Sequence, residues 1–143
     1  MSKKIIIKLG TASIFDKKKN KLKKRIISNL ARDISKLIKK DFKIIVVSSG
    51  AVGCGRNLVM SSKENISLKQ SQAAIGQVKL INEYARIFKK YNLNIAQFLI
   101  SFDDLTKQEK IKNIKNTYSL NITISEESKN KKLKNLDFRK KKC

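Results

Sequence analysis

The segment 44–56, in which a strand-like run leads directly into a loop of small residues, constrains the fold of this chain more than any other segment. Its first four residues are Ile or Val, and a short run that is apolar on both faces is typical of a buried strand in a parallel sheet. A helix that began near Gly50 would direct its free N–H groups at an anion. Three glycines would let the backbone approach a bound group closely: Gly50, Gly53 and Gly55.

The same loop has a plainer interpretation, in which its glycines serve only close packing between a strand and a helix. Two phosphate-binding motifs do not match it. The pattern G-x-x-x-x-G-K-[S/T] would need Lys and Ser or Thr after Gly55, where Arg56 and Asn57 stand. The dinucleotide pattern G-x-G-x-x-G is absent, because these glycines run G-x-x-G-x-G. The loop alone therefore leaves anion binding and packing as equal alternatives.

Strand-like and helix-like segments alternate along the chain and predict an α/β fold. The apolar run 4–9 indicates a first strand, and apolar residues at helical spacing over 22–40 indicate an amphipathic helix. With the strand at 44–48 they form a βαβ unit, whose two strands should be parallel. We expect further helices at 51–58, 68–91 and 106–118, and a third strand in the same sheet at 94–100.

The long helix 68–91 should pack closely against a neighbour, because Gly76 inside it otherwise costs up to about 1 kcal/mol relative to Ala. Six of its apolar residues can share one face: Ala73, Ala74, Val78, Ile81, Ala85 and Phe88.

Lys8 is the exception in the first strand, because it stands among Ile and Leu residues just before Gly10 and Thr11. Its amine would lie near the C-terminal end of the strand, where open α/β sheets bind ligands. Taken alone, it is slightly better explained as an edge-strand lysine in solvent than as a phosphate-contacting cation. Asp103 and Asp104, which follow the expected third strand, could bind a metal or cap the next helix.

Charge and cysteine usage limit the function only loosely. The formal net charge of +23 suits anionic partners from nucleic acid to ATP, but codon bias explains lysines spread over the whole chain equally well. We find no aromatic-lined surface, zinc ligand set or recognition helix in the sequence, and expect no specific nucleic-acid partner. Cys54 and Cys143 lack metal-ligand spacing, and Cys54 is best explained as a packing residue. Without a long apolar run or signal peptide, we expect a cytoplasmic chain that does not enter a membrane.

Several motifs together resemble the glutamate 5-kinases, a branch of the amino acid kinase family. The Ser-Gly-Ala loop and the Ala-Ala-Ile-Gly-Gln segment are specific in combination, and the matches cover roughly residues 4–118. In chain order they are Ile6-Ile7-Lys8-Leu9-Gly10-Thr11, Val46-Val47-Ser48-Ser49-Gly50-Ala51-Val52, Gly55-Arg56, Lys69-Gln70, Ala73-Ala74-Ile75-Gly76-Gln77, Ala96-Gln97, Asp103-Asp104-Leu105, Asn113 and Asn116-Thr117.

The resemblance implies a mostly parallel central sheet sandwiched by helices, the amino acid kinase fold, in incomplete form. It implies ATP-dependent phosphorylation of the L-glutamate side-chain carboxylate to glutamyl 5-phosphate, the first step of proline biosynthesis, with Mg²⁺ carried by ATP. Lys8 would be the catalytic lysine that contacts the transferring phosphoryl group, and Gly10 and Thr11 would join it in binding ATP. Glutamate would be held by Ser49, Gly50 and Ala51, while Asp103 and Asp104 would be structural and no residue would bind a metal directly.

The chain departs from the family pattern towards its end. We do not find the segment that completes the glutamate site, the nucleotide-binding half with a second catalytic lysine, or an RNA-binding-like PUA domain. Residues 1–120 are therefore interpreted as the N-terminal, glutamate-binding part of the kinase domain, and residues 121–143 as a divergent basic tail without regular structure. We expect a shortened or frameshifted product whose activity is impaired or lost. A non-catalytic remnant, a basic nucleic-acid-binding module and a homo-oligomer remain open alternatives.

Overall fold

Two parallel strands form the centre of this computed structural model, which describes residues 3–61, 65–100 and 103–118. Strand β1 (Lys3–Leu9) pairs with β4 (Phe42–Ser48), so that Ile5 lies opposite Ile44 and Leu9 lies opposite Ser48. Helix α2 (Lys24–Ile38) connects them. The β-branched residues of both strands favour this extended, packed conformation. The predicted βαβ unit is confirmed.

A short helix and a hairpin separate β1 from α2. Helix α1 (Thr11–Ile14) leads into β2 (Phe15–Asp16), which pairs antiparallel with β3 (Lys21–Leu22). One carboxylate oxygen of Asp16 accepts hydrogen bonds from the backbone N–H groups of Lys18 and Lys19, and Asn20 takes a positive φ of 49° to close the turn. The sequence analysis did not detect this hairpin, because strands of two residues leave no periodic pattern.

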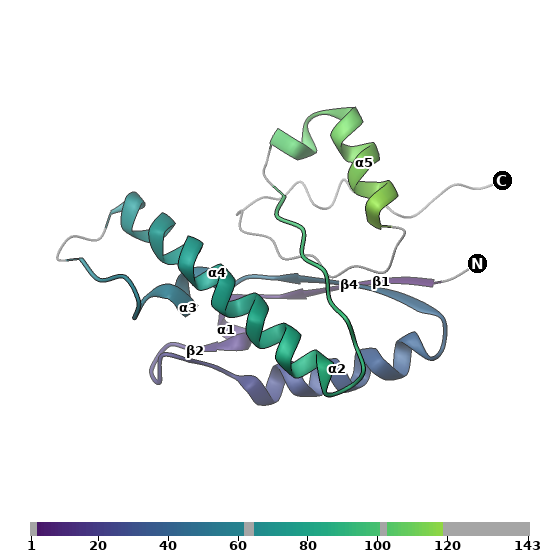
Figure 1. Ribbon diagram of the computed structural model, residues 1–143, viewed down its shortest axis with the longest axis horizontal. Coiled ribbons are helices and arrows are strands. Elements are labelled where there is room, and N and C mark those ends of the chain that lie inside the picture. Colours follow the sequence, from purple (N-terminus) through teal and green to yellow (C-terminus); the bar gives the residue numbers. More distant parts are fainter. Residues whose placement is uncertain (1–2, 62–64, 101–102, 119–143) are drawn as a thin grey trace.

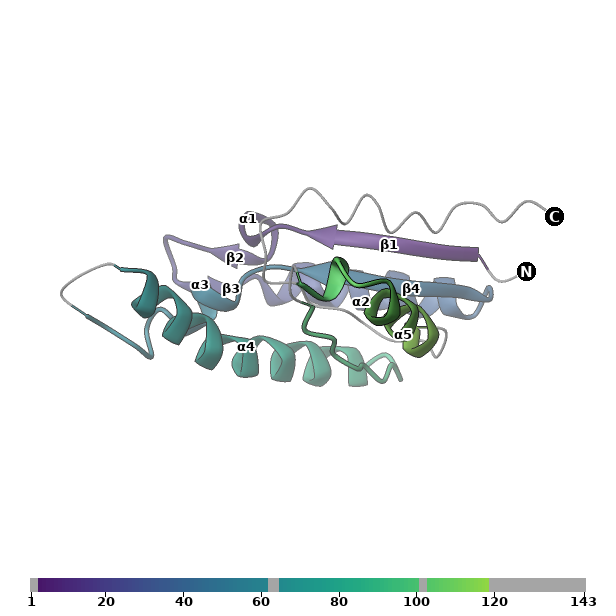
Figure 2. The same cartoon turned by 90° about the horizontal axis from the view of Figure 1, so that it is seen from above.

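The larger core cluster lies on the face of the strands that α2 and α4 (Ile66–Lys89) cover. Figure 1 shows α2 below the two strands and α5 above them, and Figure 2 shows β4 between β1 and α4 when seen from above. The strands contribute Ile44 and Val46 to this cluster, and the helices contribute mainly Ile27, Ala31, Ile34, Leu80, Tyr84, Ile87 and Phe88.

The opposite face of β4 carries a second, smaller core cluster. Ile45 and Val47 are buried there with Ile100, against the short η1 turn (Asp103–Leu105) and α5 (Gln108–Tyr118). Ile6, which lies opposite Ile45 in β1, remains 50% exposed. Helices thus cover both sides of a parallel strand pair, and the predicted α/β class is confirmed.

The predicted third strand at 94–100 is wrong, because residues 93–100 form neither helix nor strand. Leu93 and Ile95 pack against the larger cluster, whereas Phe98 and Ile100 join the smaller cluster on the other face. The segment therefore crosses from one face of the strands to the other, as Figure 1 shows between α4 and α5. Because it crosses the strands in this way, the segment does not run alongside β4 and pair with it, despite the strand preference of its Ile and Phe residues.

Helices α3 (Ala51–Gly55) and α4 approach each other so closely that only glycine fits at two positions. A Cβ atom added to Gly55 would lie 1.9 Å from the carbonyl oxygen of Gln72. A Cβ added to Gly76 would lie 1.9 Å from the carbonyl oxygen of Ala51. The close packing predicted at Gly76 is confirmed.

The packed face of α4 differs from the predicted one. Val78 is 60% exposed, and Ala74 and Ala85 are exposed as well. The buried stripe is offset around the helix and keeps only Ala73 and Phe88 of the predicted face. It consists of Gln72, Ala73, Gly76, Leu80, Tyr84, Ile87 and Phe88.

The predicted boundary at residue 120 stays a prediction, because residues 119–143 lie outside the described part of the chain. In the described ranges, none of the helices combines the length and the apolar character that crossing a membrane requires.

Gly76→Ala should lower the free energy of unfolding by about 3 kcal/mol or more, because the new methyl group must displace the backbone of α3. Gly10→Ala is the matched control, since a Cβ at Gly10 would meet nothing within 4 Å, and it should change stability by less than about 0.5 kcal/mol. Urea unfolding measures both. Equal effects of the two substitutions would contradict the close crossing.

Candidate functional site

The C-terminal ends of β1 and β4 bring together two loops that are far apart in the sequence. The backbone N–H of Ser49 donates a hydrogen bond to the carbonyl oxygen of Leu9 at 3.0 Å. The hydroxyl groups of Thr11 and Ser49 are hydrogen-bonded at 2.9 Å. The loop of Gly10 and Thr11 and the loop of Ser49 thus form one continuous surface at the end of the strands where α/β sheets usually bind ligands.

Lys8 is exposed near the same end of the sheet. It lies opposite Val47 in the parallel register, which places its side chain on the α5 side of the strands. Its side chain forms no hydrogen bond or ion pair with the residues that the structure describes. Lys8 is therefore a cation on a strand, and no side chain of the described structure neutralises its charge.

Gly50 and Ala51 hold the second loop in one conformation. Gly50 has a φ of 120°, which side-chain-bearing residues rarely adopt, and a Cβ there would lie 3.2 Å from the side chain of Ile14. Its carbonyl oxygen accepts a hydrogen bond from the backbone N–H of Cys54 at 3.0 Å, which begins α3. Ala51 is 2% exposed beneath α4. The helix predicted to begin near Gly50 is confirmed.

The glycines of the second loop do not all serve the same purpose. A Cβ at Gly53 would lie 3.1 Å from the ring of Phe15, and Gly55 packs against the backbone of α4. These two positions fit the packing interpretation. Gly10, in the first loop, has open space around it. Room for a ligand to approach the backbone therefore lies at Gly10 rather than at Gly53 or Gly55.

A buried tyrosine supports the second loop from inside the core. The hydroxyl groups of Tyr84 and Ser48 are hydrogen-bonded at 2.9 Å, and the Ser48 hydroxyl donates to the carbonyl oxygen of Ser49 at 3.2 Å. Because a serine hydroxyl has one proton to give, Tyr84 is the donor to Ser48. Burial raises the pKa of Tyr84 to about 12, so the phenol stays protonated at neutral pH.

Tyr84 was missed in the sequence analysis, although a signal was present. It follows Ala73, Gly76 and Leu80 at three- and four-residue spacing, which marks the buried stripe of a helix. A tyrosine at such a position usually needs a hydrogen-bond partner for its hydroxyl. The partner, Ser48, directly precedes the predicted glutamate loop.

Cys54 is confirmed as a packing residue. It is 3% exposed and belongs to the larger core cluster. Burial raises the pKa of its thiol to about 11, although the nearby ammonium of Lys79 acts in the opposite direction. The thiol is therefore unreactive at neutral pH.

An open groove of about 710 Å³ runs along the exposed side of α4 and is separate from the site described above. It contains none of the predicted site residues. Its lining residues are Leu58, Ala74, Ile75, Val78, Lys79, Asn82, Glu83 and Arg86.

The acidic pair after the predicted third strand is only partly described. Asp104 forms an ion pair with Lys110 at 2.7 Å, and the side chain of Asp103 lies outside the described part. Among the described residues, no group of three or more His, Cys, Asp and Glu side chains could hold a metal ion.

Comparisons with known proteins identify related sequences and a related fold. The amino acid kinase family matches residues 3–135. The glutamate 5-kinase of Pelagibacter ubique is 38% identical over 119 residues, which are 82% of this chain and 32% of that protein. The glutamate 5-kinase of Dictyoglomus thermophilum is 35% identical over 118 residues, which are 81% of this chain and 32% of that protein. The chain thus spans about a third of the length of these curated relatives.

Among solved structures, a UMP kinase from Ureaplasma parvum has a similar fold. The TM-score is 0.53 and the sequence identity is 18%, over 87% of this chain and 56% of the solved chain. This likeness concerns the fold alone.

Tyr84→Phe should lower the free energy of unfolding by about 1 kcal/mol and increase hydrogen exchange at the backbone N–H of Ser49, because Ser48 loses its donor. Tyr91→Phe is the control, since the Tyr91 hydroxyl bonds Ser28 at 2.7 Å, away from the loop. It should have a similar stability cost without the change at Ser49. Faster Ser49 exchange in both variants would contradict a specific support role.

Proposed function

Because the chain belongs to the amino acid kinase family, we propose that it is the glutamate-binding part of a glutamate 5-kinase. The proposed reaction transfers the γ-phosphoryl group of ATP to the side-chain carboxylate of L-glutamate, the first step of proline biosynthesis. The observation that carries the proposal is the 2.9 Å hydrogen bond between Thr11 and Ser49. It joins the loop proposed for ATP to the loop proposed for glutamate.

Ser49, Gly50 and Ala51 are proposed to hold the glutamate. A hydroxyl group and backbone N–H groups suit a carboxylate, and hydrogen bonds to a charged group are stronger than neutral ones. Support comes from the rigidity of this loop: Gly50 is fixed by its positive φ, and Ala51 by the contact of its carbonyl oxygen with Gly76. A site held by packed neighbours loses little conformational entropy on binding.

Lys8, Gly10 and Thr11 are proposed to bind the phosphates of ATP. The open space at Gly10 would admit a phosphate group close to the backbone, and Lys8 is an exposed cation on a strand. Mg²⁺ would enter bound to the phosphate oxygens, as this ion retains most of its non-protein ligands in kinases.

The proposed chemistry needs charge neutralisation and alignment rather than covalent participation by the protein. A carboxylate oxygen of glutamate attacks the γ-phosphorus and forms a new P–O bond. The bond between this phosphorus and the bridging oxygen breaks, and ADP leaves with the electron pair. The Lys8 ammonium would offset negative charge on the transferring group. In-line transfer requires both reactants to be held. Among the described residues we assign contacts to glutamate and to the phosphates of ATP, but none to its adenosine.

We therefore propose that residues 1–143 alone bind glutamate weakly and turn over little. This is consistent with a chain that spans about a third of the length of its curated relatives. A non-catalytic remnant with the same fold is the alternative, and glutamate binding at the Ser49 loop separates the two.

Addition of L-glutamate to the ¹⁵N-labelled chain should shift the amide resonances of Ser49, Gly50 and Ala51. Ser49→Ala should weaken binding about tenfold, because a hydroxyl bond to a carboxylate is worth about 1.5 kcal/mol or more. Ser13→Ala, in which an exposed hydroxyl of α1 is removed, should leave the affinity unchanged. The absence of glutamate-dependent shifts at 44–56, or equal effects of the two substitutions, would count against the proposed glutamate site.

A further inference from the structure

Within the part of the chain that the structure describes, positive charge is concentrated in the hairpin and helix α2. Residues 17–40 contain eleven Lys and Arg residues and one acidic residue, Asp33. Residues 41–118 contain twelve Lys and Arg and six acidic residues over a much longer stretch. Codon bias would spread lysines evenly, so composition alone does not explain this concentration.

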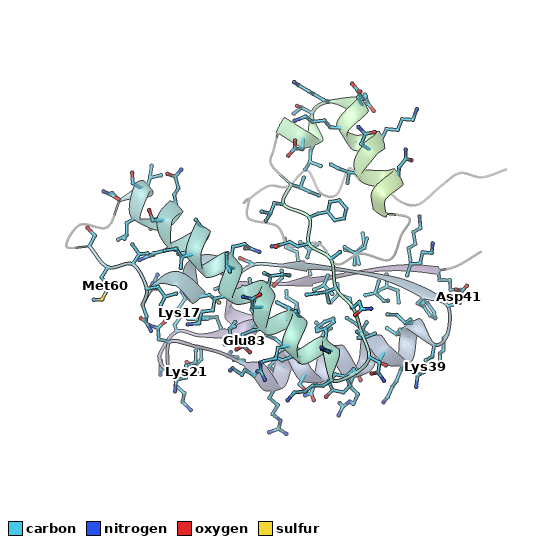
Figure 3. The ribbon with its side chains drawn as sticks, viewed as in Figure 1. Lys17, Lys21, Lys39, Asp41, Met60 and Glu83 are labelled. Carbon is cyan, nitrogen blue, oxygen red and sulfur yellow. The ribbon has the colours of Figure 1, made fainter. Side chains whose placement is uncertain are left out.

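Six of these eleven cations make up what we call the basic strip. On α2, residues spaced by seven, four and three positions share the face opposite the buried Ile27, Ala31 and Ile34. Figure 3 shows Lys21 and Lys39 towards opposite ends of α2, with Lys17 on the hairpin. The basic strip consists of Lys17, Lys21, Arg25, Arg32, Lys36 and Lys39, all of which are exposed. Its helical part extends over about 20 Å, at about 1.5 Å per residue.

The strip residues differ from the two lysines at the start of α2, which are engaged within the protein. Lys23 donates to the carbonyl oxygen of Ala12 at 2.8 Å, and Lys24 pairs with Glu83 on α4 at 3.2 Å. Of the strip side chains, only Arg32 has a partner among the described residues, the exposed Asp33 at 3.6 Å. An exposed pair of this kind contributes little to stability. The strip is therefore a row of cations, nearly all of which can pair with an anionic ligand.

We propose that the basic strip binds the phosphodiester backbone of double-stranded nucleic acid without sequence preference. A duplex presents one negative charge per roughly 1.7 Å of its axis, which complements a straight row of cations. Lys and Arg side chains contact phosphates irrespective of the base sequence. The strip has no aromatic side chain on which single-stranded bases would stack, or that would anchor it in a lipid interface. The inference is independent of the proposed kinase activity.

Fluorescence anisotropy with a labelled 24-base-pair duplex, between 50 and 200 mM NaCl, tests the proposal on the full chain. The strip variant carries Arg25→Gln, Arg32→Gln, Lys36→Gln and Lys39→Gln. The matched control removes four exposed charges elsewhere, through Lys69→Gln, Lys89→Gln, Lys107→Gln and Lys112→Gln. In the strip variant, the slope of log affinity against log salt should become shallower by about 3 to 4, at about 0.9 for each lost phosphate contact. The control should change the slope by less than about 1.

Equal losses in the two variants would overturn the proposal, because affinity would then follow net charge rather than the strip. Absence of salt-dependent binding by the native chain would also overturn it. A second duplex of unrelated sequence should bind equally well, and a strong preference for one sequence would contradict backbone recognition. Strip-dependent binding to phosphatidylserine vesicles, without binding to the duplex, would assign the surface to a membrane instead. Circular dichroism verifies that both variants remain folded.

Discussion

The close crossing of α3 and α4 is the contact on which the candidate site depends. At Gly55 and Gly76 the two helix backbones meet without side chains between them, and the carbonyl oxygen of Ala51 lies directly against α4. Since α3 follows Gly50 immediately, the position of α4 fixes the loop at the end of β4. Backbone contacts of this kind have no flexible side chain that could adjust, so they restrict movement of the loop relative to α4.

Core packing and the polar contacts of the loop depend on each other. The ring of Tyr84 belongs to the larger core cluster, and its centroid lies 5.7 Å from the centroid of the Phe88 ring. The hydroxyl of Tyr84 is hydrogen-bonded to Ser48. The next residue, Ser49, bonds the backbone of Leu9 and the hydroxyl of Thr11. A continuous series of contacts thus connects α4, the end of β4 and the loop after β1. The two loops proposed to hold the two reactants are supported by the same core.

The sequence predicted the parts of this structure that leave a strong local pattern. The runs of Ile and Val at β1 and β4, and the helical spacing of α2, identified the βαβ unit, and Gly76 indicated a close contact. Segment 94–100 was wrongly expected to be a strand, because an apolar run does not show whether the chain runs alongside β4 or crosses from one face of the strands to the other. The hairpin was too short to detect. The juxtaposition of Thr11 with Ser49, and of Tyr84 with Ser48, depends on tertiary packing, and no spacing in the sequence encodes it.

The central claim, that Lys8 and the two loops form one part of a glutamate 5-kinase site, is tested most directly by trapping the acyl phosphate with hydroxylamine. Residues 1–143 would be assayed with ATP, Mg²⁺ and glutamate, alone and with a polypeptide that comprises the unmatched part of the Pelagibacter ubique relative. The account predicts little hydroxamate from the chain alone, and formation with the added polypeptide that Lys8→Ala abolishes and Lys3→Ala does not. Robust turnover by residues 1–143 alone, or turnover that Lys8→Ala leaves intact, would contradict it.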